Sequence, residues 1–285
     1  MPDNITILLP AYNEEQSIGE TVKAIKKLHP GFEVLVVDDG STDDTAKIAK
    51  EAGANVWQHP YNIGNGAAIK TGLRYANGDW IVMMDADGQH NPAEINALLS
   101  HKDHYDMVIG ARSKGSNTSL HRDLANFIYN RLASYITKFK IEDLTSGFRL
   151  VRKATAKKFI YLLPNSFSYP TTLTMSYLRS GRSIKYVPIQ TKARQGKSKI
   201  KLIQDGVRFL LIITRIATLF SPLRVFLPIS LFFFYTGLGY YLYTFFKFSR
   251  FTNMSALLLT TSVIIFMMGM VSEQITQMRN DRTED

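Results

Sequence analysis

The sequence of 285 residues contains no cysteine, which excludes disulfide bonds and metal sites built on thiolates. A chain without cysteine fits a reducing compartment. The first residues, Met1 to Asn4, lead directly into a strand-like run, so we expect no signal peptide. The sequence also shows no obvious Ser-His-Asp set for nucleophilic catalysis. The chemistry must therefore come from other residue types.

Acidic residues are scarce in one long stretch of the chain. Between Arg179 and Arg224 there are eleven Lys or Arg residues and a single acid, Asp205, so this stretch alone carries a charge equal to the net +10 of the whole chain. A basic segment of this kind can bind nucleic acid, anionic lipid or a phosphorylated substrate. The composition alone leaves these three partners open.

The first third of the chain alternates between short apolar runs and amphipathic segments. Strands are predicted at Asn4–Leu9, Phe32–Val37 and Ala54–Gln58. Between them, a helix is predicted from a capping box at Asn13–Gln16 to about Leu28, and another from Asp43 to about Ala52. This alternation is typical of an α/β fold with a mostly parallel sheet.

The run from Trp80 to His90 stands out because an apolar strand ends in two carboxylates, Asp85 and Asp87. Residues at this spacing on a strand point to the same side. Parallel sheets bind ligands beyond the carboxyl ends of their strands, and oxygen ligands suit Mg²⁺ or Mn²⁺. A metal site is one interpretation; a solvated turn after a strand is the other.

A second loop with glycines, Asn62–Ala68, precedes a helical segment. The third glycine of a dinucleotide-binding fingerprint would fall at Ile69, so that fingerprint fails. The loop either offers backbone N–H groups to a phosphate or forms a tight turn. Further along, the pattern predicts helices at Pro92–Leu99, Leu120–Thr137 and Tyr169–Leu178, and strands at Met107–Gly110 and Ile184–Ile189.

The last part of the chain changes character. Lys199–Phe220 has the pattern of a basic amphipathic helix, typical of a membrane surface. Val225–Phe246 and Met254–Ser272 are uncharged runs long enough to cross a bilayer, with a buried helical hairpin in a soluble protein as the alternative. Positive residues precede the first run and follow the second, so we expect both termini to be cytoplasmic. A nucleic-acid partner is disfavoured because the basic segment runs into a span.

Five motifs in order resemble a known family: Pro10–Glu14, Val37–Ser41, Asp85–His90, Ser146–Arg149 and Gly196–Lys199. Over about residues 4–224 the chain is similar to family 2 glycosyltransferases of the polyprenyl-phosphate branch, which resemble dolichyl-phosphate mannose synthase. The resemblance implies a GT-A (Rossmann-like) catalytic domain over residues 1–198. It also implies an interfacial amphipathic segment over 199–222, and a transmembrane hairpin with a short cytoplasmic tail over 223–285.

The resemblance also implies a role for each matching residue. Nucleotide-sugar binding is implied for Pro10, Tyr12, Glu14, Asp39, Asp85, Ala86 and Arg112. Ligation of Mg²⁺ or Mn²⁺ is implied for Asp85, Asp87 and Gln89. Catalytic roles are implied for Asp87, Asp143 and Arg149, with Asp143 either a base or a positioning group. Phosphate contacts are implied for Arg112, Arg149, Arg194 and Lys199. The chain departs from the pattern at Asn65, where many relatives carry lysine, and at Arg194, which lies two residues before Gly196 instead of three.

The activity implied is the inverting transfer of one sugar from a nucleotide sugar to polyprenyl phosphate at the cytoplasmic face, with GDP-mannose and UDP-glucose as the first donors to test. A phosphate acceptor is already anionic and needs no strong base. The alternatives are a processive polysaccharide synthase and an inactive nucleotide-sugar-binding or lipid-transport protein. Both tryptophans, Trp57 and Trp80, precede Asp85, so the Gln-x-x-Arg-Trp motif of processive synthases is absent. Assembly into a homo-oligomer stays open.

Overall fold

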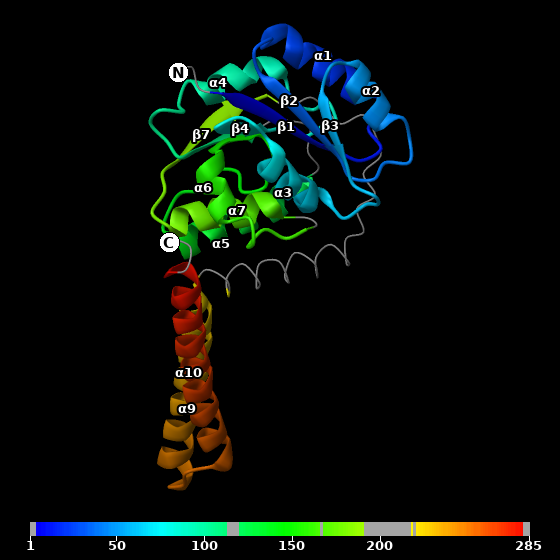
Figure 1. Cartoon of the computed structure of the whole chain (residues 1–285). Coiled ribbons are helices and arrows are strands. Elements are labelled where there is room, and N and C mark those ends of the chain that lie inside the picture. The colour runs from blue at the N-terminus through cyan, green and yellow to red at the C-terminus, as the bar shows by residue number, and fades with distance from the viewer. Residues whose placement is uncertain (1–3, 113–119, 166–167, 191–217, 219–220, 282–285) are drawn as a thin grey trace. The chain divides into compact units, whose positions relative to one another are not determined.

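The computed structural model describes residues 4–112, 120–165, 168–190, 218 and 221–281. The chain divides into two compact units, residues 1–200 and 201–285. The basic amphipathic segment predicted at 199–222 lies almost wholly outside the described residues, and so do Arg194 and Lys199. The first unit is a layered α/β structure, and the second is a pair of long helices (Figure 1).

The first unit is built on a seven-stranded sheet in the order β3-β2-β1-β4-β6-β5-β7. Strand β6 runs antiparallel to its neighbours β4 and β5, and the other pairs are parallel. The bounds are β1 Ile5–Ala11, β2 Glu33–Asp38, β3 Asn55–Gln58, β4 Trp80–Met83, β5 Met107–Arg112, β6 Arg149–Arg152 and β7 Ile184–Ile189. The predicted α/β class and the mostly parallel sheet are confirmed.

Helices cover both faces of this sheet (Figure 1). Helices α1 (Ile18–Leu28), α2 (Thr45–Glu51) and α4 (Ile95–Leu99, after the 3₁₀ turn η1, Pro92–Glu94) contribute to one buried core. Helices α3 (Asn65–Tyr75), α6 (Lys153–Lys158) and α7 (Tyr169–Arg179) contribute to the other. Helix α5 (Leu120–Thr137) packs against α7. Residues along β1 alternate between the two cores, because successive side chains of a strand point to opposite faces.

The capping box predicted at Asn13–Gln16 is wrong. Helix α1 begins at Ile18, with Ser17 in the capping position. Asn13 has a left-handed backbone (φ 55°), and its side-chain oxygen accepts hydrogen bonds from Thr42, including one of 2.9 Å from the Thr42 N–H. Asparagine tolerates this conformation. The residue therefore ties the loop after β1 to the loop after β2 and caps no helix.

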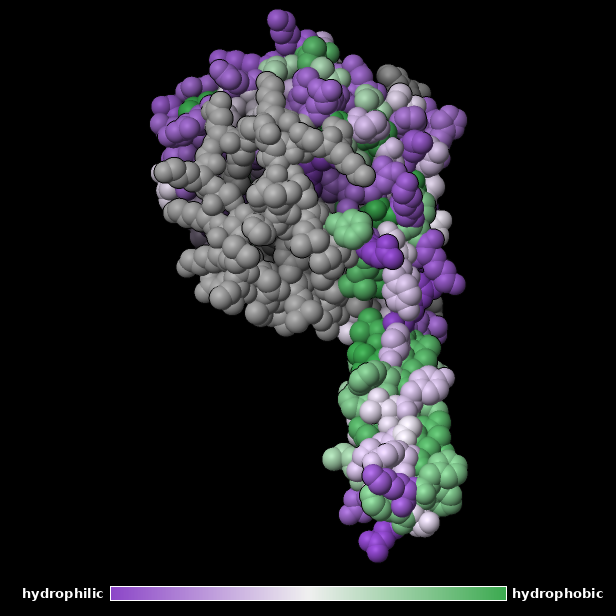
Figure 2. All heavy atoms as spheres, turned by 180° about the vertical axis from the view of Figure 1, so that it is seen from behind, coloured by the Kyte–Doolittle hydropathy of each residue, from purple (hydrophilic) through white to green (hydrophobic). Residues whose placement is uncertain are grey.

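The second unit is a helical hairpin formed by α9 (Pro222–Phe248) and α10 (Asn253–Asp281). Both helices are long and apolar enough to cross a membrane, with mean hydropathies of 1.5 and 2.1, and only 11% and 17% of their most apolar segments are buried. A core helix of a soluble protein would be mostly buried. Hydrophobic residues cover much of the hairpin surface, and hydrophilic residues gather at its tip (Figure 2).

Small residues bring the two helices of the hairpin close together. A Cβ atom on Gly237 would lie 2.9 Å from the Cβ of Leu258, and one on Gly269 would lie 2.7 Å from the Cβ of Phe226. Ser230 and Ser262 exchange hydrogen bonds, each hydroxyl donating to the other residue's backbone oxygen at 2.9 and 3.0 Å. Close approach at small residues and hydrogen bonds between helices are the usual means of packing in a bilayer.

Candidate functional site

The two carboxylates predicted as metal ligands lie where β4 ends at the edge of the sheet. The side chain of Asp85 is 38% exposed, and Asp87 and Gln89 are partly exposed. The Gln89 N–H donates to the Asp87 carboxylate at 3.1 Å, across a turn in which Gly88 has a left-handed backbone (φ 71°). These three residues therefore offer oxygen atoms to the solvent side of the sheet edge.

The Ser146–Arg149 motif is brought against Asp85 by the antiparallel pairing of β6 with β4. Met83 pairs with Arg149, so Gly147 lies opposite Asp85 when this register is continued. A Cβ atom on Gly147 would lie 2.9 Å from Asp85 Oδ2. Only glycine leaves room for the carboxylate here, which gives Gly147 a function that the sequence did not reveal.

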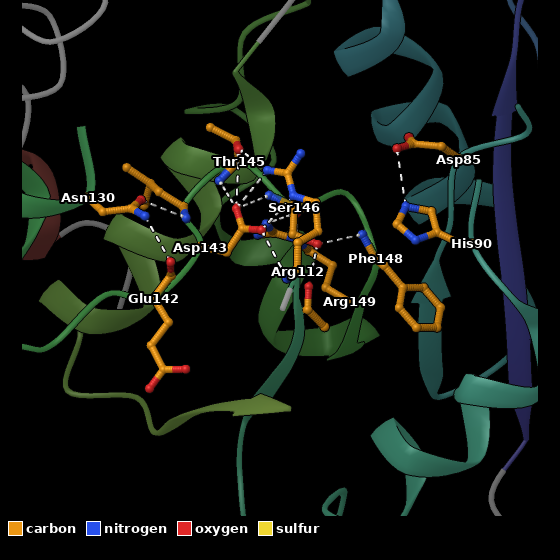
Figure 3. A network of polar contacts seen from close by, with 12 residues as sticks. Asp85, His90, Arg112, Asn130, Glu142, Asp143, Thr145, Ser146, Phe148 and Arg149 are labelled. Carbon is orange, nitrogen blue, oxygen red and sulfur yellow. Dashed lines mark hydrogen bonds and ion pairs between the residues drawn. The ribbon is translucent and has the colours of Figure 1, made fainter. Parts of the chain in front are cut away.

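His90 is a further residue of this site that the sequence reasoning left without a role. Its Nε2 lies 3.6 Å from Asp85 Oδ2, and its ring stacks on Phe148 with centroids 5.1 Å apart (Figure 3). The Nδ1 atom is buried and has no hydrogen-bond partner. The signal that points to His90 is its place as the last residue of the Asp85–His90 motif.

Asp143 is held by Arg112 in a two-pronged ion pair (Figure 3). Arg112 Nε donates to Asp143 Oδ2 at 2.8 Å, and Arg112 Nη2 donates to Asp143 Oδ1 at 3.0 Å. The N–H groups of Thr145 and Ser146 also donate to this carboxylate, both at 3.1 Å. Burial opposes ionisation of Asp143, but the Arg112 and backbone donors outweigh it, so the pKa of the carboxyl lies below its ordinary value.

Arg149 lies inside the protein. It is fully buried, and its guanidinium donates to the Pro170 carbonyl at 2.9 Å, to Thr174 Oγ1 at 3.1 Å and to the Ser146 carbonyl. Burial lowers its pKa from the ordinary value, although nearby carboxylates act in the opposite direction. The expected phosphate contact is not available to a guanidinium in this position. Its bonds join β6 to α7 beneath the Ser146–Gly147 turn.

Asp39 is also turned inward. Its carboxylate accepts hydrogen bonds from the N–H groups of Ile63 at 3.0 Å and Gly64 at 2.7 Å, and from His59 Nδ1 at 2.7 Å. His59 Nε2 in turn lies 2.9 Å from Thr71 Oγ1 on α3. Because the carboxylate only accepts, His59 donates from Nδ1 and accepts the Thr71 proton at Nε2. Asp39 therefore anchors the glycine loop Asn62–Gly66, and sequence reasoning missed His59.

The Pro10–Glu14 motif reaches the same edge of the sheet. Pro10 is buried in β1, whereas the Tyr12 side chain is 44% exposed. Ser17 Oγ donates to the Glu14 carboxylate at 3.2 Å and to the Ala86 carbonyl at 2.8 Å. This hydroxyl links the loop after β1 to the Asp85–Asp87 turn. The structure thus gathers Tyr12, Glu14, Asp85 and Asp87 around one edge.

The donor set fits a divalent cation that shares its ligands with a substrate. Among the described residues, no group of three or more His, Asp or Glu side chains could hold a metal alone. Asp85 and Asp87 would supply two carboxylates, with Gln89 beside them. Mg²⁺ and Mn²⁺ commonly combine one or two carboxylates with waters and substrate phosphates. The edge can therefore hold a metal–diphosphate pair.

Comparison with known proteins agrees with this arrangement. Residues 6–159 match the family described as glycosyl transferase family 2, and residues 221–278 match the one described as GtrB C-terminal hairpin. The uncharacterized protein MJ1222 of Methanocaldococcus jannaschii is 35% identical over 66% of this chain and 82% of its own length. Glycosyltransferase AglJ of Haloferax volcanii is 31% identical over 85% and 81%.

A third relative is the undecaprenyl-phosphate 4-deoxy-4-formamido-L-arabinose transferase of Proteus mirabilis, 30% identical over 59% of this chain. The chain spans 58% of that protein's length, less than two thirds. Among solved structures, glucosyl-3-phosphoglycerate synthase of Mycobacterium tuberculosis, in complex with Mn²⁺ and UDP-glucose, has a TM-score of 0.60 at 24% identity over 76% of this chain and 78% of its own. This likeness shows the fold. The sheet, its acidic edge and the matched residues together establish that the chain belongs to glycosyl transferase family 2.

Proposed function

We propose that this protein transfers a single sugar from a nucleotide sugar to polyprenyl phosphate at the cytoplasmic face of a membrane. The observation that carries the proposal is one chain with both parts of the apparatus. A family 2 unit presents Asp85 and Asp87 at its sheet edge, and a hairpin of the GtrB type follows it. A lipid-linked acceptor explains why a sugar-transfer domain is joined to helices that can cross a bilayer.

The names of the relatives support a lipid phosphate as the acceptor. The Proteus mirabilis and Photorhabdus laumondii relatives are named as transferases that act on undecaprenyl phosphate. GDP-mannose and UDP-glucose stay the first donors to test, and UDP-glucose is bound with Mn²⁺ in the structural relative from Mycobacterium tuberculosis. A Mg²⁺ or Mn²⁺ ion held by Asp85, Asp87 and Gln89 would neutralise charge on the donor diphosphate.

The proposed reaction is a direct displacement. An oxygen of the acceptor phosphate forms a bond to the anomeric carbon while the bond from that carbon to the nucleotide diphosphate breaks. The nucleoside diphosphate leaves with the electron pair, and the anomeric configuration is inverted. The acceptor phosphate is already anionic, so no proton has to be removed by a strong base.

Asp143 therefore acts in this scheme as a positioning group. Its carboxylate is held ionised by Arg112 and by two backbone N–H groups, which lowers its basicity. A weak base is poorly suited to proton abstraction but well suited to hold Arg112 and the Thr145–Ser146 turn in place. Arg149, buried below this turn, stabilises it from inside and touches no substrate.

The test is transfer of label by the purified full-length protein. It is incubated with polyprenyl phosphate, a divalent cation and, in separate reactions, radiolabelled GDP-mannose or UDP-glucose, and the label is then extracted into organic solvent. We expect one donor to give an organic-soluble product that mild acid releases as a single sugar. Label found only in long polymer would refute the proposal in favour of a processive synthase, and no transfer from any nucleotide sugar would refute it altogether.

A further inference from the structure

Helix α5 has two faces of opposite character. Its inner face carries Tyr129, Ala133 and Ile136, which are at most 4% exposed, and the Tyr129 hydroxyl donates to Thr171 on α7 at 3.2 Å. At about 100° per residue, these three side chains fall within an arc of about 60°. This arc is the apolar stripe by which α5 packs on the catalytic unit.

The outer face of α5 is aromatic and basic. Phe127 is 61% exposed and Tyr135 57% exposed, and the exposed Arg131 lies between them on the same side. These three positions fall within an arc of about 80°, opposite the buried stripe. The helix ends at Thr137, and the exposed Lys138 and Lys140 follow. We call Phe127, Arg131, Tyr135, Lys138 and Lys140 the α5 outer surface.

The same helix supports the loop that carries Asp143. Asn130 Nδ2 donates to the Glu142 carbonyl at 2.8 Å, and Asn130 Oδ1 accepts from the Leu144 N–H at 3.1 Å, so this one side chain holds the backbone on both sides of Asp143 (Figure 3). Ser134 Oγ accepts from the Ile141 N–H at 3.0 Å. The Asp143 loop therefore lies one helix thickness from the α5 outer surface.

We propose that the α5 outer surface rests on the headgroup region of an anionic bilayer. Exposed aromatic rings beside Lys and Arg are the composition of segments that lie at a membrane interface, since rings occupy the headgroup level and cations pair with anionic lipids. A second copy of the chain is a poorer occupant. A two-fold contact would set the surface against itself and oppose its three cations to three others.

This contact gives the Asp143 loop a place in substrate delivery, and that consequence rests on the proposed function. A polyprenyl phosphate keeps its chain in the bilayer, so only its phosphate rises to the headgroup level. With α5 lying on the headgroups, the Asn130-bound loop holds Asp143 and its partner Arg112 just above that level. The α5 outer surface would then set the height at which the acceptor phosphate is met.

The chain has no cysteine, so single cysteines can be introduced for spin labelling without background. Nitroxides are attached in the full-length protein at Phe127→Cys and Tyr135→Cys, and as a matched control at Leu28→Cys, which is 50% exposed at the end of α1 on the opposite face of the sheet. The protein is reconstituted in nanodiscs with or without anionic phosphatidylglycerol. Collision rates are measured with oxygen, which concentrates in lipid, and with a water-soluble nickel chelate.

We expect the labels at 127 and 135 to collide more with oxygen and less with nickel than the label at 28, and we expect this difference to shrink without anionic lipid. An Arg131→Glu substitution should shrink it as well, whereas Arg131→Lys should preserve it. Equal accessibility at all three sites overturns the proposal. Protection of 127 and 135 from both reagents also overturns it, because it indicates a protein contact. No substrate is present, so these outcomes do not depend on glycosyl transfer.

Activity tests the delivery step separately. The Phe127→Ala/Tyr135→Ala double variant should lose about tenfold in initial rate with long-chain polyprenyl phosphate in a bilayer. The same variant should keep its rate with a short, water-soluble alkyl phosphate acceptor. A Leu28→Ala variant should keep both rates. If the double variant loses both rates equally or neither rate, the outer surface has no part in acceptor delivery.

Discussion

At the scale of single residues, charged side chains of the candidate site fall into two groups. Asp85 and Asp87 face the solvent edge of the sheet, whereas Asp39, Asp143 and Arg149 are buried and bonded within the protein. Members of the first group can bind a ligand without breaking internal bonds. Members of the second group act through the backbone and side chains that they hold, and their substitutions should behave differently.

The Asp87→Ala variant should lose nearly all transfer activity while keeping its fold. Removal of one carboxylate takes away a ligand of the proposed metal, and an exposed position leaves the core unchanged. Initial rates and circular dichroism are the measurements, with Asp103→Ala as the control because the Asp103 side chain is 73% exposed away from the site. The wild-type protein should also stop in EDTA and recover with Mg²⁺ or Mn²⁺. Full activity in EDTA would refute the metal assignment.

The pair His59→Asn and His59→Gln separates anchoring of the glycine loop from a merely structural role. An asparagine amide can take the place of Nδ1 and donate to Asp39, whereas glutamine reaches toward Thr71 instead. We expect Gln to raise the KM for the nucleotide sugar about tenfold with little change in kcat, and Asn to stay near wild type. Hydrogen exchange at residues 62–66 should be faster in Gln alone. Equal effects of both substitutions would contradict the anchoring role.

The ionised Asp143 should make stability depend on acidic pH. Its pKa is lower in the folded protein than the ordinary value of about 3.9. The stabilisation is therefore fully present above pH ~4 and is lost as the pH falls through the lower folded pKa. The melting temperature of the wild type should drop over that range, and Asp143→Asn should show a lower melting temperature at neutral pH and a shallower drop. An identical pH dependence in both proteins would exclude Asp143 as its source.

At the scale of elements, two glycines of α9 give a matched test of hairpin packing. A Cβ atom on Gly237 would lie 2.9 Å from Leu258 Cβ, whereas one on Gly239 would meet nothing within 4 Å. Gly237→Ala should destabilise the hairpin by about 1–3 kcal/mol through overpacking. Gly239→Ala should be neutral or stabilise the helix by up to about 1 kcal/mol. Thermal unfolding in one detergent measures both, and equal shifts would contradict the packing described here.

Elements also differ in how well their sequence pattern predicted them. The strands and most helices were predicted within a few residues, because buried parallel strands and amphipathic helices have strong periodicities. The start of α1 was not, since Asn13 satisfies Thr42 across the loop and the helix begins only at Ile18. A capping motif is local, and a tertiary hydrogen bond from a distant loop outweighed it.

At the scale of the whole molecule, the proposal that both termini are cytoplasmic makes a prediction about labelling. Arg208, Arg215 and Arg224 precede the hairpin tip and Arg279 and Arg282 follow it, whereas only Lys247 and Arg250 lie at the tip. Single cysteines at Ser249, in the tip, and at Glu51, in α2, should react with an impermeant maleimide from opposite sides of sealed vesicles. Reaction of both from one side would refute the orientation.

By itself, the sequence determined the class of the fold, the two apolar helices and the position of the acidic edge. Each of these follows from short-range pattern: period 2 or 3.6 in hydrophobicity, uncharged length, and two carboxylates directly after a buried strand. These features needed no knowledge of what lies beside them, and the structure bears them out at Asp85 and Asp87, in the sheet and in α9 and α10.

Only the tertiary structure decided which charged residues face a ligand. Asp39 meets Gly64, Arg112 meets Asp143 and Arg149 meets Thr174, and each pair is brought together from positions 25 or 31 residues apart. A motif letter is the same whether its charge is exposed or bonded inside. The difference depends on desolvation and on partners supplied by other strands and helices, which exist only once the sheet has closed between its two layers of helices.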